Sequence, residues 1–273
     1  MLFLAYMGFF SKIFGSSKEV AVDKIKSMGK LSFLEVDVHN HLLPGIDDGS
    51  KSVEESIDLI KGLNGLGFSQ YICTPHIMDG VHPNTKATIS ASFDKLNMAL
   101  KDSSSKVKIF PAAEHMIDDG IQPLIDKDNL CVMPGGYVLI EMSYLSESRS
   151  LFQTILDIQN LGYKPILAHP ERYNYYHYDF KMYKQIKDAG CLLQLNLLSI
   201  SRYYGTEVKV AALTMLKSGM YDFVGTDLHH EKHLTALQDV VGKYPVRDLL
   251  RTCNILNPTL LDHVNDNDSI AAG

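Results

Sequence analysis

The 273-residue sequence has no block of basic residues, and its formal net charge is −6. Proteins that bind the nucleic-acid backbone carry clustered lysine and arginine, so a general nucleic-acid-binding function is disfavoured. The sequence also has no C-x-x-C pair, because its four cysteines, Cys73, Cys131, Cys191 and Cys253, are scattered. This spacing is typical of buried thiols in a reducing compartment. Nothing around Cys73 resembles the phosphate-binding loop of a cysteine-dependent phosphatase.

The apolar run at the N-terminus is too short to cross a bilayer, which takes about 20 apolar residues. Residues 1–14, MLFLAYMGFFSKIF, also lack the small-residue cleavage site of a signal peptide. We expect an apolar helical face that includes Phe9 and Phe10 to dock on a membrane surface, on the body of the protein or on a second subunit. The predicted organisation is an N-terminal extension over residues 1–31, one domain over residues 32–263 and a frayed tail over residues 264–273.

From residue 35 onward, short apolar runs alternate with longer amphipathic segments, at one unit per roughly 30 residues. Ser52 and Glu55 form a capping box that starts a helix, and Gly65 and Gly67 are expected to end it. A composition that is 45% hydrophobic supplies one large core, which fits a single (β/α) barrel or a doubly wound domain. Strands are predicted near residues 35–39, 71–74, 107–110, 137–141, 165–169, 192–196 and 222–227.

Side chains that can bind metal stand at the ends of these predicted strands. His39 and His41 are two residues apart, so on a strand they point to the same face and would grip one ion. Six of the seven strands end in His, Asp or Glu, and such groups must be paired or coordinated when buried. Because the carboxyl ends of barrel strands converge on the active site, the pattern predicts a metal centre. Imidazole and carboxylate together suit Zn, Mn or Fe. The set is His39, His41, His76, Glu114, Glu141, His169, Asn196, Asp227 and His229.

Six motifs, in order along the chain, resemble the PHP (polymerase and histidinol phosphatase) superfamily. They are Asp37-Val38-His39-Asn40-His41, Thr74-Pro75-His76, Ala113-Glu114, Ile140-Glu141, Ala168-His169-Pro170-Glu171-Arg172-Tyr173 and Thr226-Asp227-Leu228-His229. The H-x-E-R-Y and D-x-H forms are most similar to its bacterial branch of manganese-dependent protein-tyrosine phosphatases, which accompanies capsular or exopolysaccharide synthesis. The resemblance runs from about residue 33 to about residue 258. It implies an α/β fold, a distorted TIM-like (β/α)7 barrel known as the PHP fold.

The resemblance also implies two or three metal ions per chain, with Mn2+ expected and Fe, Zn or Co as alternatives. Carried over by motif, the ligands of one ion would be His39, His41, Glu114 and Asp227. Glu114 would bridge to a second ion, whose other ligands would be Glu141 and His169. The ligands of the third ion would be Asp48, His76 and His229, with Asp48 favoured over Asp47.

Arg172 matches the active-site arginine of that branch, and its planar guanidinium suits two phosphoryl oxygens in a way that lysine does not. The branch usually has a second arginine shortly after the D-x-H motif, which this chain lacks. Lys232 or His233 would replace it as a phosphate contact. His229 or a metal-bound water would protonate the leaving oxygen. Tyr173 and the tyrosines after it form either a rim that stacks on a substrate ring or a cluster that packs a loop onto the barrel.

The expected activity is hydrolysis of phosphotyrosine on a protein, with the attacking hydroxide formed from metal-bound water of lowered pKa. The resemblance implies a bacterial tyrosine kinase tail in polysaccharide export as partner. It also implies a cytoplasmic location, either free or peripheral at the inner face of the membrane. A small-molecule phosphatase such as histidinol phosphatase is the alternative enzyme, because the same metal site would serve it. A catalytically silent scaffold is disfavoured by the nearly complete ligand set, and DNA proofreading by the absence of a basic groove signal.

Overall fold

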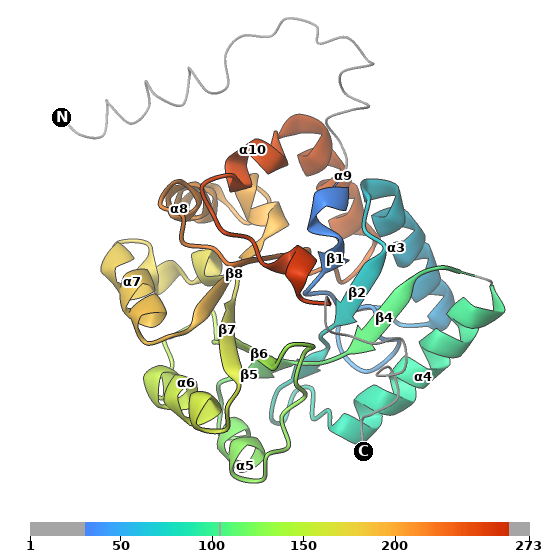
Figure 1. The fold of residues 1–273 in the computed structure, drawn as a ribbon, viewed down its shortest axis with the longest axis horizontal. Coiled ribbons are helices and arrows are strands. Elements are labelled where there is room, and N and C mark those ends of the chain that lie inside the picture. Colours follow the sequence, from blue (N-terminus) through green and yellow to red (C-terminus); the bar gives the residue numbers. More distant parts are fainter. Residues whose placement is uncertain (1–30, 104, 262–273) are drawn as a thin grey trace, which may run out of the picture.

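The computed structural model describes residues 31–103 and 105–261, so the predicted docking segment and C-terminal tail lie outside the described residues. Strands and helices alternate along the chain (Figure 1). The strands are β1 (Val36–Asp37), β2 (Gln70–Cys73), β3 (His76–Ile77), β4 (Lys108–Pro111), β5 (Glu114–Met116), β6 (Tyr137–Glu141), β7 (Lys164–Ala168), β8 (Leu192–Asn196) and β9 (Phe223–Gly225). The α-helices are α3 (Val53–Leu66), α4 (Lys86–Asp102), α5 (Ile121–Asp126), α6 (Leu151–Asn160), α7 (Phe180–Asp188), α8 (Thr206–Lys217), α9 (Glu231–Lys243) and α10 (Val246–Leu250). Short 3-10 helices are η1 (Ser32–Leu34), η2 (Pro170–Arg172), η3 (Asn174–Tyr176), η4 (Leu197–Ile200) and η5 (Asn257–Thr259).

The strands pair in parallel and in chain order, as βα repeats require. One sheet has the order β1-β2-β4 and the other has the order β3-β5-β6-β7-β8-β9. β2 leads into β3 across Thr74 and Pro75, and β4 leads into β5 across Ala112 and Ala113, so these pairs act as two bent strands. Counted in this way, the curled sheet has the predicted (β/α)7 pattern of a distorted α/β barrel. The sequence prediction included β2 and β4 but missed β3 and β5, which follow the bends.

The first and last strands meet to close the curled sheet. The backbone N–H of Asp227 donates to the carbonyl of His39 at 2.7 Å, and the N–H of His41 donates to the carbonyl of Leu228 at 2.9 Å. Beside them, the buried carboxylate of Asp37 accepts hydrogen bonds from the N–H of Thr226 at 2.9 Å and from its hydroxyl at 2.6 Å. These contacts bring predicted ligands from the two ends of the domain's sequence to one place.

A side chain from η5 completes the closure at the level of β1 and β9 themselves. Asn257 is fully buried, and its Nδ2 donates to the carbonyls of Val36 at 3.0 Å and Val224 at 2.7 Å. Its Oδ1 accepts the N–H of Val224 at 2.9 Å. The amide thus links the backbones of the two strands.

The inside of the barrel changes from apolar to polar along the strands. Side chains two residues apart point to the same side of a sheet. Leu139 of β6 therefore lies in the inner apolar cluster with Phe223 of β9, and Glu141 follows Leu139 at the carboxyl end of the same strand. Asp227 lies two residues beyond the carboxyl end of β9, which begins at Phe223. The polar end is the one at which α/β barrels carry their active sites.

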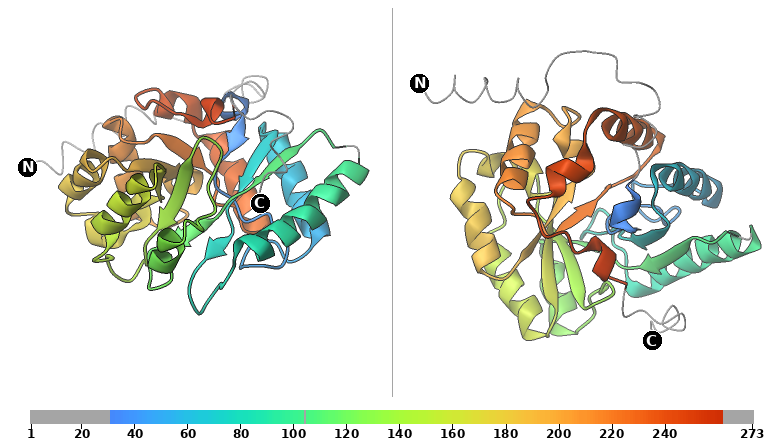
Figure 2. Two further views of the ribbon diagram at one scale, coloured as in Figure 1. Left: turned by 60° about the horizontal axis from the view of Figure 1, so that its bottom comes forward. Right: turned by 45° about the horizontal axis from the view of Figure 1, so that its top comes forward.

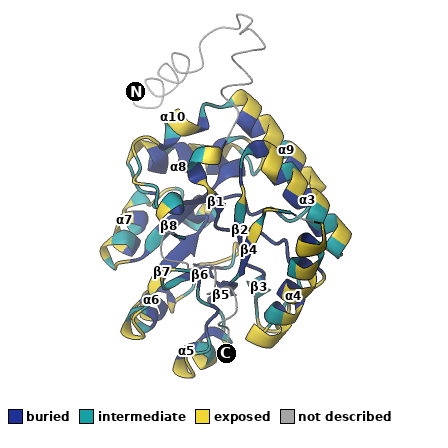
Figure 3. Cartoon of the chain, turned by 45° about the vertical axis from the view of Figure 1, so that its right-hand side comes forward, coloured by how far each residue is buried: buried dark blue, intermediate teal, exposed yellow. Residues whose placement is uncertain are grey.

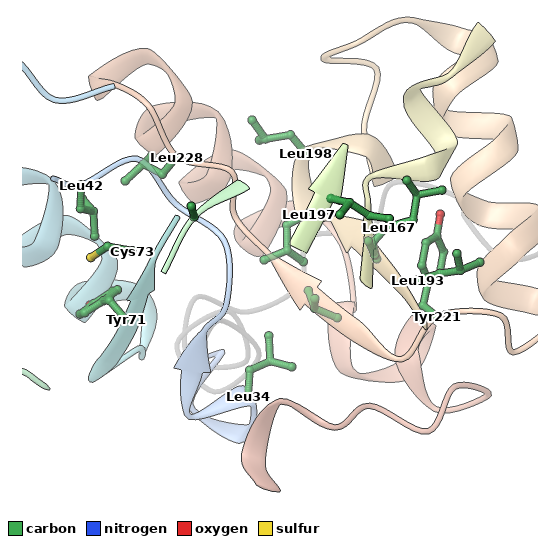
Figure 4. Packing of buried hydrophobic residues seen from close by; sticks show 14 of the residues in the cluster. Leu34, Leu42, Tyr71, Cys73, Leu167, Leu193, Leu197, Leu198, Tyr221 and Leu228 are labelled. Atoms are coloured by element: carbon green, nitrogen blue, oxygen red, sulfur yellow. The ribbon is translucent and has the colours of Figure 1, made fainter. Parts of the chain in front are cut away.

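Helices surround the strands in each view (Figure 2) and direct their exposed faces outward (Figure 3). Outward strand residues such as Leu167 and Leu193 pack with helix residues in the outer core (Figure 4). One of the two hydrogen bonds of the predicted capping box is present: the hydroxyl oxygen of Ser52 accepts the backbone N–H of Glu55 at 3.2 Å. Gly67, with φ 112°, caps the other end of α3. Gly65 was also expected there, but it lies inside the helix.

Candidate metal centre

Four side chains from three parts of the chain converge at the polar end of the barrel. The Nε2 atom of His39 lies 3.2 Å from Glu114 Oε2 and 3.4 Å from Asp227 Oδ1. The Nε2 atom of His41 lies 3.5 Å and 3.4 Å from the same two oxygens, and 3.3 Å from His39 Nε2. Ligand atoms about 2.1 Å from an ion in tetrahedral coordination lie about 3.4 Å from one another. The spacing of this set therefore fits one cation.

Hydrogen bonds on the far side of each imidazole turn Nε2 toward this point. His39 Nδ1 lies 3.0 Å from the side-chain oxygen of Gln194, and His41 Nδ1 lies 2.8 Å from Asp47 Oδ2. Both partners are acceptors, so each Nδ1 carries the hydrogen. In the neutral ring this leaves the Nε2 lone pair free, which is the arrangement that metal-binding histidines use.

Two further groups share members with the first. His41, Asp48, His76 and His229 place one ligand atom each within 4.8 Å of one another, and so do His76, Glu114 and Glu141. The imidazole of His76 stands between the two groups: its Nδ1 is 2.9 Å from Glu141 Oε1, and its Nε2 is 3.5 Å from Asp48 Oδ1.

The structure thus brings the nine predicted ligands together, but the second group differs from its predicted membership, and the third contains His41 in addition to its predicted members. His76 Nδ1 takes the place expected for His169, whereas His169 Nε2 lies 3.0 Å from Glu114 Oε1, the other oxygen of that carboxylate. Asp48 was favoured over Asp47 as a ligand, and Asp47 instead supports His41 and accepts the backbone N–H of His76 at 3.1 Å. The assignment of each residue as a metal ligand stays a prediction.

Several buried polar atoms in these groups make no hydrogen bond of good geometry among the described residues, although each lies within 3.5 Å of another polar side-chain atom. They are His76 Nδ1, Glu114 Oε2, Glu141 Oε1 and Asp227 Oδ1. Such atoms are costly to bury unless a partner satisfies them. All four belong to the groups described above, and imidazole with carboxylate is a donor set for Mn, Fe or Zn. The residues present therefore fit divalent cations.

The charges in the cluster lead to the same conclusion. Burial alone would raise the pKa of Glu114, but His39, His76 and His169 hold it well below its ordinary value. For Asp227, His39 and His229 likewise overcome burial and lower the pKa. Burial, together with the charge of Glu114, raises the pKa of Glu141. The cluster therefore holds two ionised carboxylates, Glu114 and Asp227, next to the carboxyl group of Glu141. A cation bound among them would be stabilised by their negative charge.

Close backbone approaches explain two glycines in the motifs. A Cβ on Gly49, the last residue of the Asp-Asp-Gly segment, would lie 2.3 Å from the carbonyl oxygen of His41. A Cβ on Gly225, at the end of β9, would lie 2.5 Å from the Cβ of His39. Glycine at these positions lets the chain pass directly behind the two histidines.

Arg172 lies at the edge of the cluster, as its motif predicts, with its side chain 18% exposed. Its Nη1 donates to Asp227 Oδ2 at 2.6 Å. The guanidinium lies between two tyrosine rings, 4.5 Å from the centre of Tyr144 and 4.1 Å from that of Tyr204. Burial alone would lower the pKa of Arg172, but Tyr144, Asp227 and Tyr204 raise it, so the group stays charged. A fixed cation beside a set of metal ligands is suited to binding an anion.

The tyrosines after Arg172 pack a loop onto the barrel, which was one of the two interpretations of the sequence. Tyr173 is fully buried, and its hydroxyl accepts the N–H of Met142 at 2.9 Å. Tyr175 donates to the carbonyl of Ser143 at 3.0 Å. Tyr173 is therefore engaged in packing, and its predicted contact with substrate stays a prediction.

The two expected substitutes for a second arginine differ in position. Lys232 is exposed on the first turn of α9. His233 is partly buried, and its Nδ1 lies 3.2 Å from the carbonyl of Asp227 and 3.3 Å from the N–H of His229. Burial and the neighbouring His229 lower the pKa of His233 to about 4. His233 therefore supports the D-x-H backbone as a neutral ring, and phosphate binding by either residue remains a prediction.

Sequence reasoning missed Gln194 and Tyr144. The side-chain oxygen of Gln194 is shared between His39 Nδ1 and the N–H of His169, at 3.0 and 3.3 Å. The sequence did offer a signal for Gln194. Side chains alternate along β8, so Gln194 points to the same side as Asn196, which is one of the residues predicted at the strand ends. Tyr144 had no such signal, since it follows β6 in a loop.

Among the described residues, the helices are all too short or too polar to form a transmembrane span.

Comparisons with known proteins agree with the geometry. The chain is 28% identical over 198 residues to the tyrosine-protein phosphatase YwqE of Bacillus subtilis (strain 168), an alignment that covers 72% of this chain and 78% of that protein. It also matches a crystal structure from work on YwqE of Bacillus subtilis and CpsB of Streptococcus pneumoniae, described as unique metal-dependent tyrosine phosphatases. That match has a TM-score of 0.69 at 26% identity and covers 81% of this chain and 96% of the other.

A histidinol phosphate phosphatase from Lactococcus lactis shares the fold alone, with a TM-score of 0.52 at 16% identity over 81% of this chain and 94% of the other. The sequence model of the family described as capsular polysaccharide synthesis, CpsB/CapC, matches residues 35–244. That span contains every predicted ligand together with Arg172, and it covers more than half of the chain. The chain therefore belongs to the CpsB/CapC family, within the PHP superfamily that its motifs resemble.

Proposed function

We propose that this chain is a metal-dependent protein-tyrosine phosphatase, a phosphoric monoester hydrolase that acts on phosphotyrosine. The observation that carries the proposal is a buried cluster of imidazoles and carboxylates, with unpartnered atoms, beside the charged Arg172. Family membership supports the same activity, because relatives of this family are tyrosine-protein phosphatases.

The three side-chain groups are the proposed sites of two or three divalent cations, with Mn2+ as the expected metal and Fe, Zn or Co as alternatives. The first would be held by His39, His41, Glu114 and Asp227, with Glu114 shared with a second site. A bound divalent cation supplies hydroxide near neutral pH and neutralises charge on phosphoryl oxygens. Gln194 and Asp47 would hold the imidazoles of the first site in the correct tautomer.

Arg172 is the proposed phosphoryl-binding residue. Its planar guanidinium is pre-oriented between two rings, so less conformational freedom is lost when it binds two phosphoryl oxygens. His229 or a metal-bound water is the proposed proton donor to the leaving oxygen. The Nδ1 of His229 lies 2.9 Å from the carbonyl of Asp227 and its Nε2 lies 3.4 Å from Asp48 Oδ1, so the imidazole could donate from Nε2 only while that atom is not bound to metal. A tyrosine leaving group has a reference pKa near 10, so it needs less protonation than an alkoxide does.

A flexible tail of a bacterial tyrosine kinase in capsular or exopolysaccharide export is the proposed protein substrate. The family's link to capsular polysaccharide synthesis supports this assignment. The proposed location is the cytoplasm, with residues 1–31 available to dock on the inner membrane face or on a second subunit. That location would place the enzyme where a kinase tail is accessible.

The test compares kcat/KM for a phosphotyrosine peptide, the matching phosphoserine peptide and histidinol phosphate at one Mn loading, with metal analysis of the same sample. We expect the phosphotyrosine peptide to be preferred, with at least two equivalents of metal bound. Glu114→Gln should remove turnover while the protein stays folded, because this residue belongs to two of the groups. A tenfold preference for histidinol phosphate would favour the small-molecule enzyme instead. Less than one equivalent of metal, with no gain in activity on adding Mn, would contradict the metal-dependent mechanism.

A further inference from the structure

The loop after β6 presents two side chains that the proposed chemistry leaves unassigned. Tyr144 is 40% exposed and Leu145 is 94% exposed, although Glu141 lies only three residues before Tyr144. Their position next to the candidate metal centre distinguishes them from the other exposed hydrophobic residues.

This loop is fixed to the barrel by hydrogen bonds from the tyrosine cluster. Tyr173 and Tyr175 hold its first two residues, as described above, and the hydroxyl of Tyr176 donates to Glu147 Oε1 at 2.8 Å. The backbone is therefore held directly before Tyr144, and the side chain of Glu147 is held after it. A binding wall of this kind loses little conformational entropy when a ligand meets it.

Tyr144 contacts the two parts of the site that a phosphoryl group would approach. Its hydroxyl lies 3.3 Å from His169 Nε2, and the guanidinium of Arg172 lies over its ring. Part of the same residue remains open to solvent.

A phosphoryl group bound at Arg172 would place the attached organic group next to Tyr144. Aromatic rings interact favourably when their centres are 4.5–7 Å apart, in offset or edge-to-face arrangements. The phenyl ring of phosphotyrosine is joined to phosphorus through one oxygen, so a phosphoryl group at Arg172 would bring that ring within reach of Tyr144, whose ring centre lies 4.5 Å from the guanidinium. Tyr204 is placed differently: it lies against the other side of Arg172, and its hydroxyl accepts a hydrogen bond from Asn196 Nδ2 at 3.2 Å.

We propose that Tyr144 is the residue that makes this site selective for aryl over alkyl phosphates, with Leu145 extending the apolar wall toward the substrate chain. This role is separate from the substrate contact expected of Tyr173. It rests on the proposed phosphatase function, because it needs a phosphoryl group at Arg172.

The test measures binding of two phosphonates that cannot be hydrolysed, benzylphosphonate and butylphosphonate, to Mn-loaded protein by titration calorimetry. We expect the wild type to bind the aryl compound about 3- to 10-fold more tightly, the range that one aromatic pair provides. Tyr144→Leu should remove this preference, whereas Tyr144→Phe should keep it. Tyr204→Leu is the matched control, since it also removes a ring from Arg172 and should weaken both ligands equally.

Two kinds of result would overturn the proposal, and they are distinguishable. If Tyr144→Leu kept the aryl preference, or if the wild type had none, Tyr144 would not determine selectivity, although the phosphatase function would stand. Equal weakening of both ligands in Tyr144→Leu, with the preference intact, would show that Tyr144 merely positions Arg172. If the wild type bound neither phosphonate and did not hydrolyse a phosphotyrosine peptide, both the inference and the proposed function would be lost.

Discussion

Asn257 offers a direct test of how the barrel is closed, because one side chain links β1 to β9. We predict that Asn257→Ala destabilises the protein by about 4–5 kcal/mol. The change removes three hydrogen bonds, each contributing about 1 kcal/mol net, and it leaves the buried N–H of Val224 without its partner, which adds about 1–2 kcal/mol. For a domain of this size, such a loss lowers Tm by about 10 °C.

The assay is thermal unfolding followed by circular dichroism, together with Mn binding by titration calorimetry. Mn affinity should fall as well, because β1 leads to His39 and His41 and β9 leads to Asp227. Asn257→Asp should be at least as harmful, since it replaces the donor to two carbonyls with an acceptor. Thr259→Ala is the control: this exposed residue of η5 makes a local hydrogen bond to the carbonyl of Leu256, and its loss should cost at most about 0.5 kcal/mol.

The reasoning would be refuted if Asn257→Ala melted within about 2 °C of the wild type and bound Mn with unchanged affinity. In that case the backbone contacts at His39 and His41 would be sufficient to close the barrel. Asn257 lies beyond residue 244, where the family match ends, so the outcome also tests the expectation that the domain extends to about residue 263.

Three further predictions concern the site and the termini. Arg172→Lys should lower kcat by about 10-fold or more with metal content unchanged, because lysine cannot place two donors on one phosphoryl group; wild-type kinetics would contradict this. EDTA should inhibit where iodoacetamide does not, because burial raises the pKa of Cys131 to about 11 and that of Cys191 to about 12 and keeps both thiols protonated and inaccessible. Removing residues 1–30 should leave kcat unchanged and alter liposome flotation or light scattering, and a truncated protein with unchanged association would argue against docking.

The sequence was a good guide to the site wherever a functional residue followed a strand. Glu141 ends β6 at the predicted residue, and Asp227 follows β9 within the predicted segment. Alternation of side chains along a strand is a local property, so a strand that is recognised also reveals which of its residues face inward. The motif resemblance then supplied what a single strand could not, namely which strand ends meet.

Other features depend on partners that are distant in sequence. Asn257 bonds to residues 33 and 221 positions away, and no local pattern marks an asparagine in a 3-10 helix as a link between strands. The position of Tyr144 depends on hydrogen bonds from Tyr173 and Tyr175, some 30 residues later. The tyrosine-rich segment was recognised as important, but composition does not reveal whether such rings meet a ligand or a neighbouring loop.

Two of the four non-glycine residues with positive φ in the described part of the chain belong to the candidate metal centre, and the other two, Glu35 and Asp128, lie elsewhere. His169 has φ 34° and Asp227 has φ 51°, and both are in the left-handed region that residues with a side chain seldom occupy. Each such residue costs on the order of 1–3 kcal/mol. The strain persists because neighbouring strands hold both backbones: His169 N–H donates to Gln194, and Asp227 N–H donates to the carbonyl of His39. Glycine would avoid this strain, although aspartate and histidine occupy the left-handed region more often than most residues do. Imidazole and carboxylate at these two turns place both side chains inside the barrel, where the candidate metal centre lies.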